Sequence, residues 1–215
     1  VPMVIRAPTG AGMQLGATHS QSFETWLCEV PGLKVVAPSN PKDALGLLRS
    51  SIKDPNPVIF AESAGLYGTK GDVPEEYFDI ETGKADIKQE GTDITLISYG
   101  HGIPMINKVS EELSKKNVSS EIIDLRSLSP IDYDLINKSV QKTGRALLLD
   151  TARKNGGVMA EVATNINEDS GDYLDGPILR VGSEDVPWPY NKKLEQHAMS
   201  SVPKIMNKIE QGYSL

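Results

Sequence analysis

The feature that most constrains the fold is an alternation of short apolar runs with segments of helical periodicity. The runs with strand character cover residues 1–6, 33–36, 57–60, 94–97, 120–125, 145–149 and 177–181. Helical periodicity separates them over residues 20–30, 41–54, 104–116, 132–140 and 158–167. Strands that alternate with helices are typical of parallel sheets covered by helices. The sequence therefore predicts an α/β fold with two parallel or mixed β-sheet layers flanked by helices.

The alternation lapses once, in an acidic stretch with Gly and Pro and few apolar residues. This interruption predicts two domains, residues 1–62 and 93–215, joined by a linker over residues 63–92. The chain begins inside an apolar run, Val1 to Arg6, with no initiator Met, signal region or helix cap before it. We therefore expect part of the first domain to lie upstream of these residues.

Composition excludes several classes of function. The 215 residues contain 22 Lys and Arg against 29 Asp and Glu, a net charge of −7 that argues against nucleic-acid binding. No apolar run approaches the roughly 20 residues of a membrane span. The single cysteine, Cys28, cannot form an internal disulfide, and we expect a buried, inert thiol. No glycine-rich nucleotide-binding loop is found between a strand and a helix.

One Gly-rich loop presents a candidate catalytic residue, His19. The glycines of residues 7–18 predict an irregular loop before the first helix. With Ser20 as the expected N-cap, His19 would lie near the positive end of the helix dipole, which favours the neutral imidazole. A neutral imidazole can accept or relay protons. On position alone, a surface or packing histidine is the commoner outcome.

Two groups of motifs, one in each expected domain, occur in order along the chain. The motifs of the first domain are Ile5-Arg6, Gly10, His19 to Ser22, Pro31 to Val36, Pro38 and Asp54 to Pro57. Those of the second are Asp124 to Pro130, Lys142 to Arg145, Gly156-Gly157 and Asp185 to Tyr190. Together they resemble the beta subunit of thiamine-diphosphate-dependent 2-oxoacid dehydrogenases, the pyruvate, branched-chain and acetoin types, and the resemblance covers nearly the whole chain. It implies part of a transketolase pyrimidine-binding domain followed by a transketolase C-terminal domain, with the N-terminal third of the subunit missing.

The resemblance also implies the chemistry. His19 matches the active-site histidine of the family, which implies general acid–base catalysis and help in passing the acyl group to a lipoyl arm. The implied cofactor is thiamine diphosphate with Mg²⁺, shared with an alpha subunit. Neither Gly71 to Val73 nor Gly171 to Tyr173 fits the diphosphate motif, so we expect that half of the site on the other chain, and no cofactor-binding residue here. The activating glutamate of the family lies upstream, and Glu24 and Glu29 are expected to be solvated.

A monovalent-cation site is the second site that the resemblance implies. Main-chain oxygens around Met3, Ser51, Ile52, Asp54 and Asn56 would hold a potassium ion, because hard cations favour oxygen ligands. From the residues alone, an ordinary helix C-terminus followed by turn residues explains the same pattern.

The implied partners are an alpha subunit in an α2β2 assembly, a lipoyl acyltransferase core and a 2-oxoacid substrate. Pyruvate is the favoured substrate, and acetoin or branched-chain types are alternatives, because Asp150-Thr151 departs from the residues common in relatives. A non-catalytic docking module is an alternative of another class. His101 and His197 are expected at the surface. The expected location is the cytoplasm in bacteria, and the mitochondrial matrix or plastid in eukaryotes.

Overall fold

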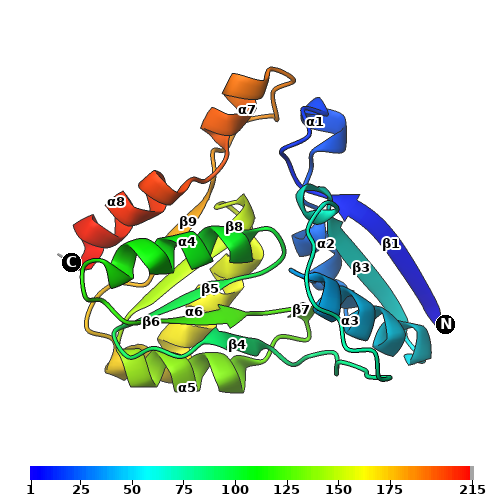
Figure 1. The fold of residues 1–215 in the computed structure, drawn as a ribbon, viewed down its shortest axis with the longest axis horizontal. Coiled ribbons are helices and arrows are strands. Elements are labelled where there is room, and N and C mark those ends of the chain that lie inside the picture. The colour runs from blue at the N-terminus through cyan, green and yellow to red at the C-terminus, as the bar shows by residue number, and fades with distance from the viewer. Residues whose placement is uncertain (214–215) are drawn as a thin grey trace.

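Two sheets organise residues 1–213, the part of the chain that the computed structural model describes (Figure 1). The strands are β1 (Met3–Thr9), β2 (Lys34–Val36), β3 (Pro57–Ser63), β4 (Asp86–Gln89), β5 (Ile94–Ser98), β6 (Ser120–Asp124), β7 (Ser127–Ser129), β8 (Ala146–Arg153) and β9 (Leu179–Ser183). The α-helices are α1 (Gly16–His19), α2 (Glu24–Cys28), α3 (Pro41–Lys53), α4 (Gly102–Ser114), α5 (Tyr133–Thr143), α6 (Val158–Ser170), α7 (Lys192–Ala198) and α8 (Val202–Tyr213). Two short 3₁₀ helices are η1 (Ala64–Leu66) and η2 (Gly171–Tyr173).

The first sheet has the strand order β1-β3-β2-β7. The first three strands are parallel, and β1 pairs with β3 from Met3 opposite Pro57 to Thr9 opposite Ser63. Helix α3 begins after Asn40, whose side chain accepts a hydrogen bond from the main chain of Asp43. Its buried Leu47 packs with apolar residues of β2 and β3, which holds the helix against one face of the sheet.

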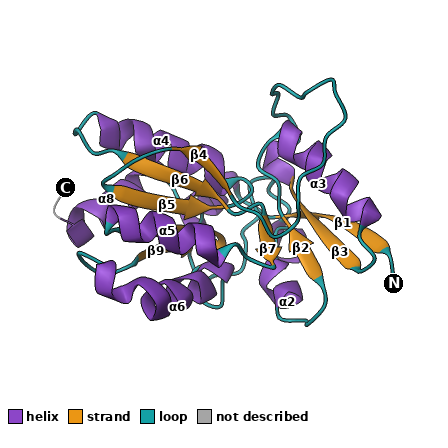
Figure 2. Ribbon diagram, turned by 90° about the horizontal axis from the view of Figure 1, so that it is seen from below, coloured by secondary structure: helices purple, strands orange, loops and turns teal. Residues whose placement is uncertain are grey.

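The second sheet has the order β4-β6-β5-β8-β9, parallel except for β4. Apolar side chains of α4 and α8 cover one face, and those of α5 and α6 cover the other (Figure 2). Strands β5 and β6 are buried throughout, because helices lie on both faces. The predicted α/β class with mixed sheets flanked by helices is therefore confirmed.

The helix predicted over residues 20–30 is wrong at its start. Ser20 is the C-cap of α1, and α2 begins only at Glu24, so His19 ends one helix rather than preceding another. Gln21 explains the break. Its side chain donates to the Ala17 carbonyl at 2.7 Å, and its own carbonyl accepts from the main-chain N–H of Gly10 at 3.2 Å. Tied to both segments, Gln21 cannot continue a helix. The helix-dipole argument for His19 therefore fails.

The two sheets are joined by more than the covalent connection. Strand β7 follows β6 in the sequence but pairs antiparallel with β2 of the first sheet. A buried charge cluster lies beside this junction, where Lys88 of β4 pairs with Asp43 of α3 at 2.7 Å. Ser39 donates to the carboxylate of Asp124, and burial raises the pKa of Asp124 to about 7. Residues 63–92, predicted as the linker, thus include β4, which belongs to the second sheet.

Candidate functional site

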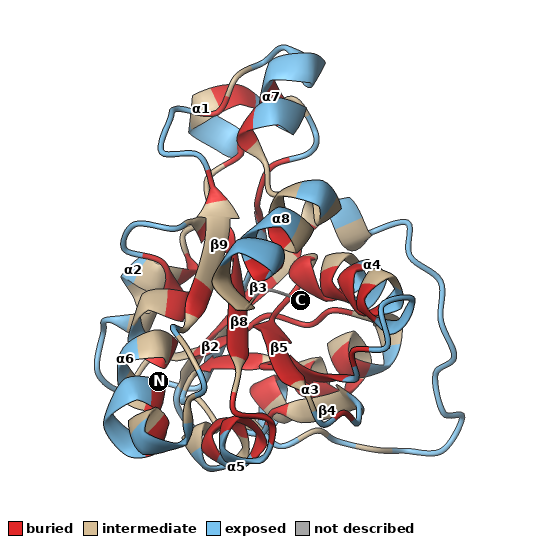
Figure 3. Ribbon diagram, turned by 90° about the vertical axis from the view of Figure 1, so that its left-hand side faces the viewer, coloured by how far each residue is buried: buried red, intermediate tan, exposed pale blue. Residues whose placement is uncertain are grey.

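His19 lies at a projecting end of the molecule formed by α1 and α7 (Figures 1 and 3). Its side chain is exposed, and its imidazole forms no hydrogen bond with another residue of the 1–213 range. Helix α1 has only four residues, too few to be stable by itself. The position of His19 therefore depends on what holds the neighbouring loop. An exposed imidazole without protein partners is available to exchange protons with a bound molecule.

The loop before α1 is shaped by a close contact at Gly16. Gly16 has φ +72°, and a Cβ atom there would lie 2.3 Å from the Tyr190 ring. Only glycine fits both the left-handed backbone and this contact. Tyr190 follows β9, so the second domain supports the helix that carries His19.

Glu24 lies beneath this loop, and the expectation that it is solvated is wrong. Glu24 is only 2% exposed, because α2 packs between β2 of the first sheet and α6 of the second domain. The Thr9 hydroxyl donates to Oε1 at 2.8 Å, while Oε2 is buried with no hydrogen-bond partner among the described residues. Burial raises the pKa of Glu24 to about 7. Glu29 is exposed, as expected, and burial raises the pKa of the half-buried Cys28 to about 12.

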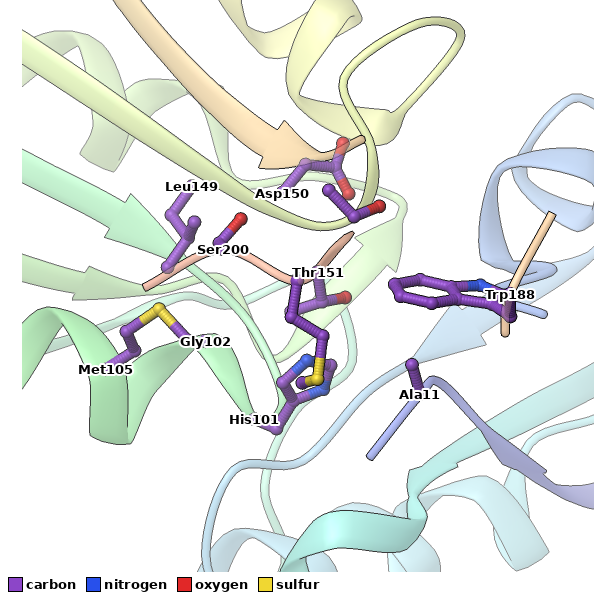
Figure 4. Close-up of a pocket in the computed structure, with 11 residues that line it drawn as sticks. Ala11, His101, Gly102, Met105, Leu149, Asp150, Thr151, Trp188 and Ser200 are labelled. Carbon is purple, nitrogen blue, oxygen red and sulfur yellow. The ribbon is translucent and has the colours of Figure 1, made fainter. Parts of the chain in front are cut away.

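His101 was expected at the surface, and this expectation is also wrong. It is half-buried before α4 and lines a small pocket between the domains (Figure 4). Asp150, Thr151 and Trp188 line the same pocket. Burial lowers the pKa of His101 to about 4, so its imidazole is neutral at physiological pH. His197 is exposed on α7, as predicted.

Asp150 is a buried carboxylate at the edge of this pocket. It accepts hydrogen bonds from the Tyr99 hydroxyl at 2.8 Å and from the main-chain N–H groups of Ala152 and Met159 at 2.9 and 3.1 Å. Burial raises the pKa of Asp150, although these hydrogen bonds oppose the shift. The bonds fix the turn that leads from β8 into α6. The burial of Asp150 is thus explained by its hydrogen bonds within the second domain.

The predicted cation-site residues converge at one end of the first sheet. Met3 pairs with Pro57, next to Asn56, and α3 ends at Lys53 beside them. The Asp54 carboxylate forms an ion pair with Lys34 and accepts the main-chain and side-chain N–H groups of Asn56 at 2.9 and 3.0 Å. This carboxylate is therefore already engaged. Any cation here would depend on main-chain oxygens, a ligand type that suits potassium.

Family comparisons match both parts of the chain. The model described as "Transketolase, pyrimidine binding domain" matches residues 1–70, and "Transketolase, C-terminal domain" matches residues 83–205. The chain belongs to the transketolase family. The solved structure "Split gene transketolase, inactive beta4 tetramer" has the same fold, with a TM-score of 0.77 at 21% identity over 99% of this chain and 66% of that chain.

Curated relatives of the chain are beta subunits of the pyruvate dehydrogenase E1 component. The chain is 40% identical over 210 residues to "Pyruvate dehydrogenase E1 component subunit beta-1, mitochondrial" of Arabidopsis thaliana, covering 96% of this chain and 58% of the relative. It is 44% identical over 192 residues to "Pyruvate dehydrogenase E1 component subunit beta" of Bacillus subtilis, covering 89% of this chain and 59% of the relative. It is 41% identical over 218 residues to the mitochondrial beta subunit of Saccharomyces cerevisiae, covering 99% of this chain and 60% of the relative. The chain spans about three-fifths of the length of these relatives.

Transketolase-family membership implies thiamine diphosphate as the cofactor. The Gly71 to Val73 segment is an exposed loop, and Gly171 to Tyr173 forms η2, with Asp172 exposed. Neither provides the Gly-Asp-Gly motif. Glu24 is turned into the protein, so it does not present a carboxylate beside His19. Within residues 1–213, the diphosphate and activating groups of the family are therefore not found.

Proposed function

We propose that the chain functions as part of the beta subunit of a 2-oxoacid dehydrogenase that acts on pyruvate. The observation that carries the proposal is the exposed imidazole of His19, which has no hydrogen-bond partner among residues 1–213 and ends the short helix α1. The 40–44% identity to pyruvate dehydrogenase beta subunits over most of the chain supports the substrate. In this proposal His19 donates and accepts protons at the substrate-derived group.

The other groups of the reaction come from outside this chain. Thiamine diphosphate, when bound, supplies the carbanion chemistry, and we propose that an alpha subunit holds its diphosphate and Mg²⁺. His19 is exposed at the projecting end formed by α1 and α7, which leaves room for an alpha chain and for a lipoyl arm that collects the acyl group. The proposed assembly is α2β2 bound to a lipoyl acyltransferase core.

Location and domain organisation follow from the same proposal. Relatives are found in bacteria and in mitochondria, so we propose the cytoplasm for a bacterial protein and the mitochondrial matrix or plastid for a eukaryotic one. None of the helices in the described part of the chain is long and apolar enough to cross a membrane. We propose two domains, residues 1–62 and 93–215, connected by residues 63–92. Strand β4 of that connection pairs with β6 as an edge strand of the second sheet.

The experiment for the proposed function is reconstitution of the full-length subunit with its alpha subunit. Pyruvate, branched-chain 2-oxoacids and acetoin are supplied in turn, with a lipoylated domain as the acceptor. We expect the highest kcat/KM for pyruvate. A preference for acetoin or branched-chain substrates would contradict the pyruvate assignment. A folded complex that turns over none of the three would instead support a docking module.

A potassium ion at the end of α3 is a separate proposal with its own prediction. Replacing Na⁺ with K⁺ at constant ionic strength should raise the thermal unfolding temperature of the chain, because a ligand at about 100 times its Kd stabilises by about 2.7 kcal/mol. Asp54→Ala removes the bonds that shape the loop and should abolish the K⁺ effect. Asp72→Ala, at an exposed position, is the matched control. Equal unfolding temperatures in the two salts would contradict the site.

A further inference from the structure

Glu195 is a fully buried carboxylate that reaches from the second domain to the loop of His19. It lies on α7 with 0% exposure. Its Oε1 accepts the main-chain N–H of Gly12 at 3.0 Å and that of Gln14 at 3.2 Å. Its Oε2 accepts the main-chain N–H of Gln14 at 3.2 Å and the side-chain amide of the same residue at 2.8 Å. One carboxylate thus holds the loop at the main-chain N–H groups of Gly12 and Gln14.

Burial of this carboxylate requires compensation. No Lys or Arg among the described residues forms an ion pair with Glu195. A buried charge is costly unless hydrogen bonds replace its hydration. Here the loop supplies those bonds. The loop therefore supplies the hydrogen bonds that the buried carboxylate requires, and the carboxylate in turn holds the loop in its conformation.

The loop is held in a backbone conformation that it would not choose by itself. Gln14 has φ +55°, in the left-handed region that residues with a side chain disfavour. Gln14 donates to both carboxylate oxygens of Glu195 from its main-chain N–H and to Oε2 from its side-chain amide, and these hydrogen bonds hold it in this conformation. Nearby, Trp188, Ala198 and Met199 pack on Ala11 of the same loop. Residues 188–199 therefore hold residues 11–14, and α1 begins two residues later at Gly16.

We infer that Glu195 is a positioning residue for His19, acting through the main chain of Gly12 and Gln14. The inference rests on the proposed catalytic role of His19. Because α1 has only four residues, its direction follows from that of the loop before it. Misplacement of an acid–base group by about 1 Å lowers rates up to about 100-fold. Loss of the carboxylate should therefore lower kcat while the rest of the substrate site keeps KM unchanged.

The test compares Glu195→Ala and Glu195→Gln with Glu168→Gln in the reconstituted complex. Glu168 is exposed on α6 and makes no ion pair with another residue of the 1–213 range, so its variant controls for loss of one negative charge. Glu195→Gln keeps one carbonyl acceptor for the loop, and we expect a smaller defect than in Glu195→Ala. Expected results for the alanine variant are at least about tenfold faster hydrogen exchange at Gly12 and Gln14 and a fall in kcat of about 10- to 100-fold.

A double variant separates positioning from general damage. If Glu195 acts through His19, Glu195→Ala adds no further loss of kcat to His19→Ala. Multiplicative losses would overturn the inference, as would unchanged exchange at Gly12 and Gln14. If His19→Ala alone has wild-type turnover, the proposed function fails instead. In that case faster exchange with unchanged kcat in Glu195→Ala would keep the loop contact but overturn its link to catalysis.

Discussion

Replacement of His19 by alanine in the complete complex lowers lipoyl-linked turnover by about 100-fold or more, the usual scale for a positioned acid–base group. Alanine removes the proton-transfer group, while the imidazole is exposed and has no hydrogen-bond partner within residues 1–213, so its removal breaks no hydrogen bond among them. Protein stability should therefore remain close to that of the unmodified chain. The measurement is steady-state turnover of pyruvate with a lipoylated acceptor, together with thermal unfolding of the same preparation.

His197→Ala is the matched control for this prediction. His197 is also exposed and lies on α7 at the same end of the molecule (Figure 3). We expect its variant to retain turnover. Near-normal turnover of His19→Ala would contradict the catalytic role, and an equal loss in both variants would indicate a surface effect.

Glu24→Gln is expected to change how stability depends on pH. Burial raises the pKa of Glu24 from its ordinary value of 4.5 to about 7, so the folded chain binds a proton that the unfolded chain releases between these values. Stability contributed by the protonated carboxyl is present below pH 4.5 and is lost as pH rises to about 7. The loss amounts to about 3 kcal/mol, because each tenfold step in acidity corresponds to about 1.4 kcal/mol.

Glutamine reproduces the neutral carboxyl but cannot ionise. Glu24→Gln should match the unmodified chain near pH 4.5 and exceed its stability by up to about 3 kcal/mol at pH 8. Denaturant unfolding at both pH values measures the difference. Asp124, whose pKa is also raised, is not among the groups that shift Glu24 and contributes equally to both proteins. Glu29→Gln, at an exposed position, is the control. An equal pH dependence in Glu24→Gln and the unmodified chain would contradict the prediction.

The sequence by itself determined the fold class and the candidate catalytic residue. The repeat of apolar runs and helical periodicity is local, so strands such as β5 and β8 and helices such as α3 and α6 are visible in it. Strands β4 and β7 were not predicted, because each contains a single apolar residue and so shows no apolar run. His19 came from motif resemblance, since its position alone did not distinguish it from a surface histidine.

Only the tertiary structure decided which polar side chains are buried and what they hold. Glu24 and His101 looked solvated because burial depends on packing between domains, which no local pattern records. The strongest support of the His19 loop joins Gly12 to Glu195, residues that are 183 positions apart. Sequence spacing carries no signal over that distance. The contact exists because the segment between β9 and α8, which includes α7, packs against the loop that follows β1, and the same packing decides how His19 is presented.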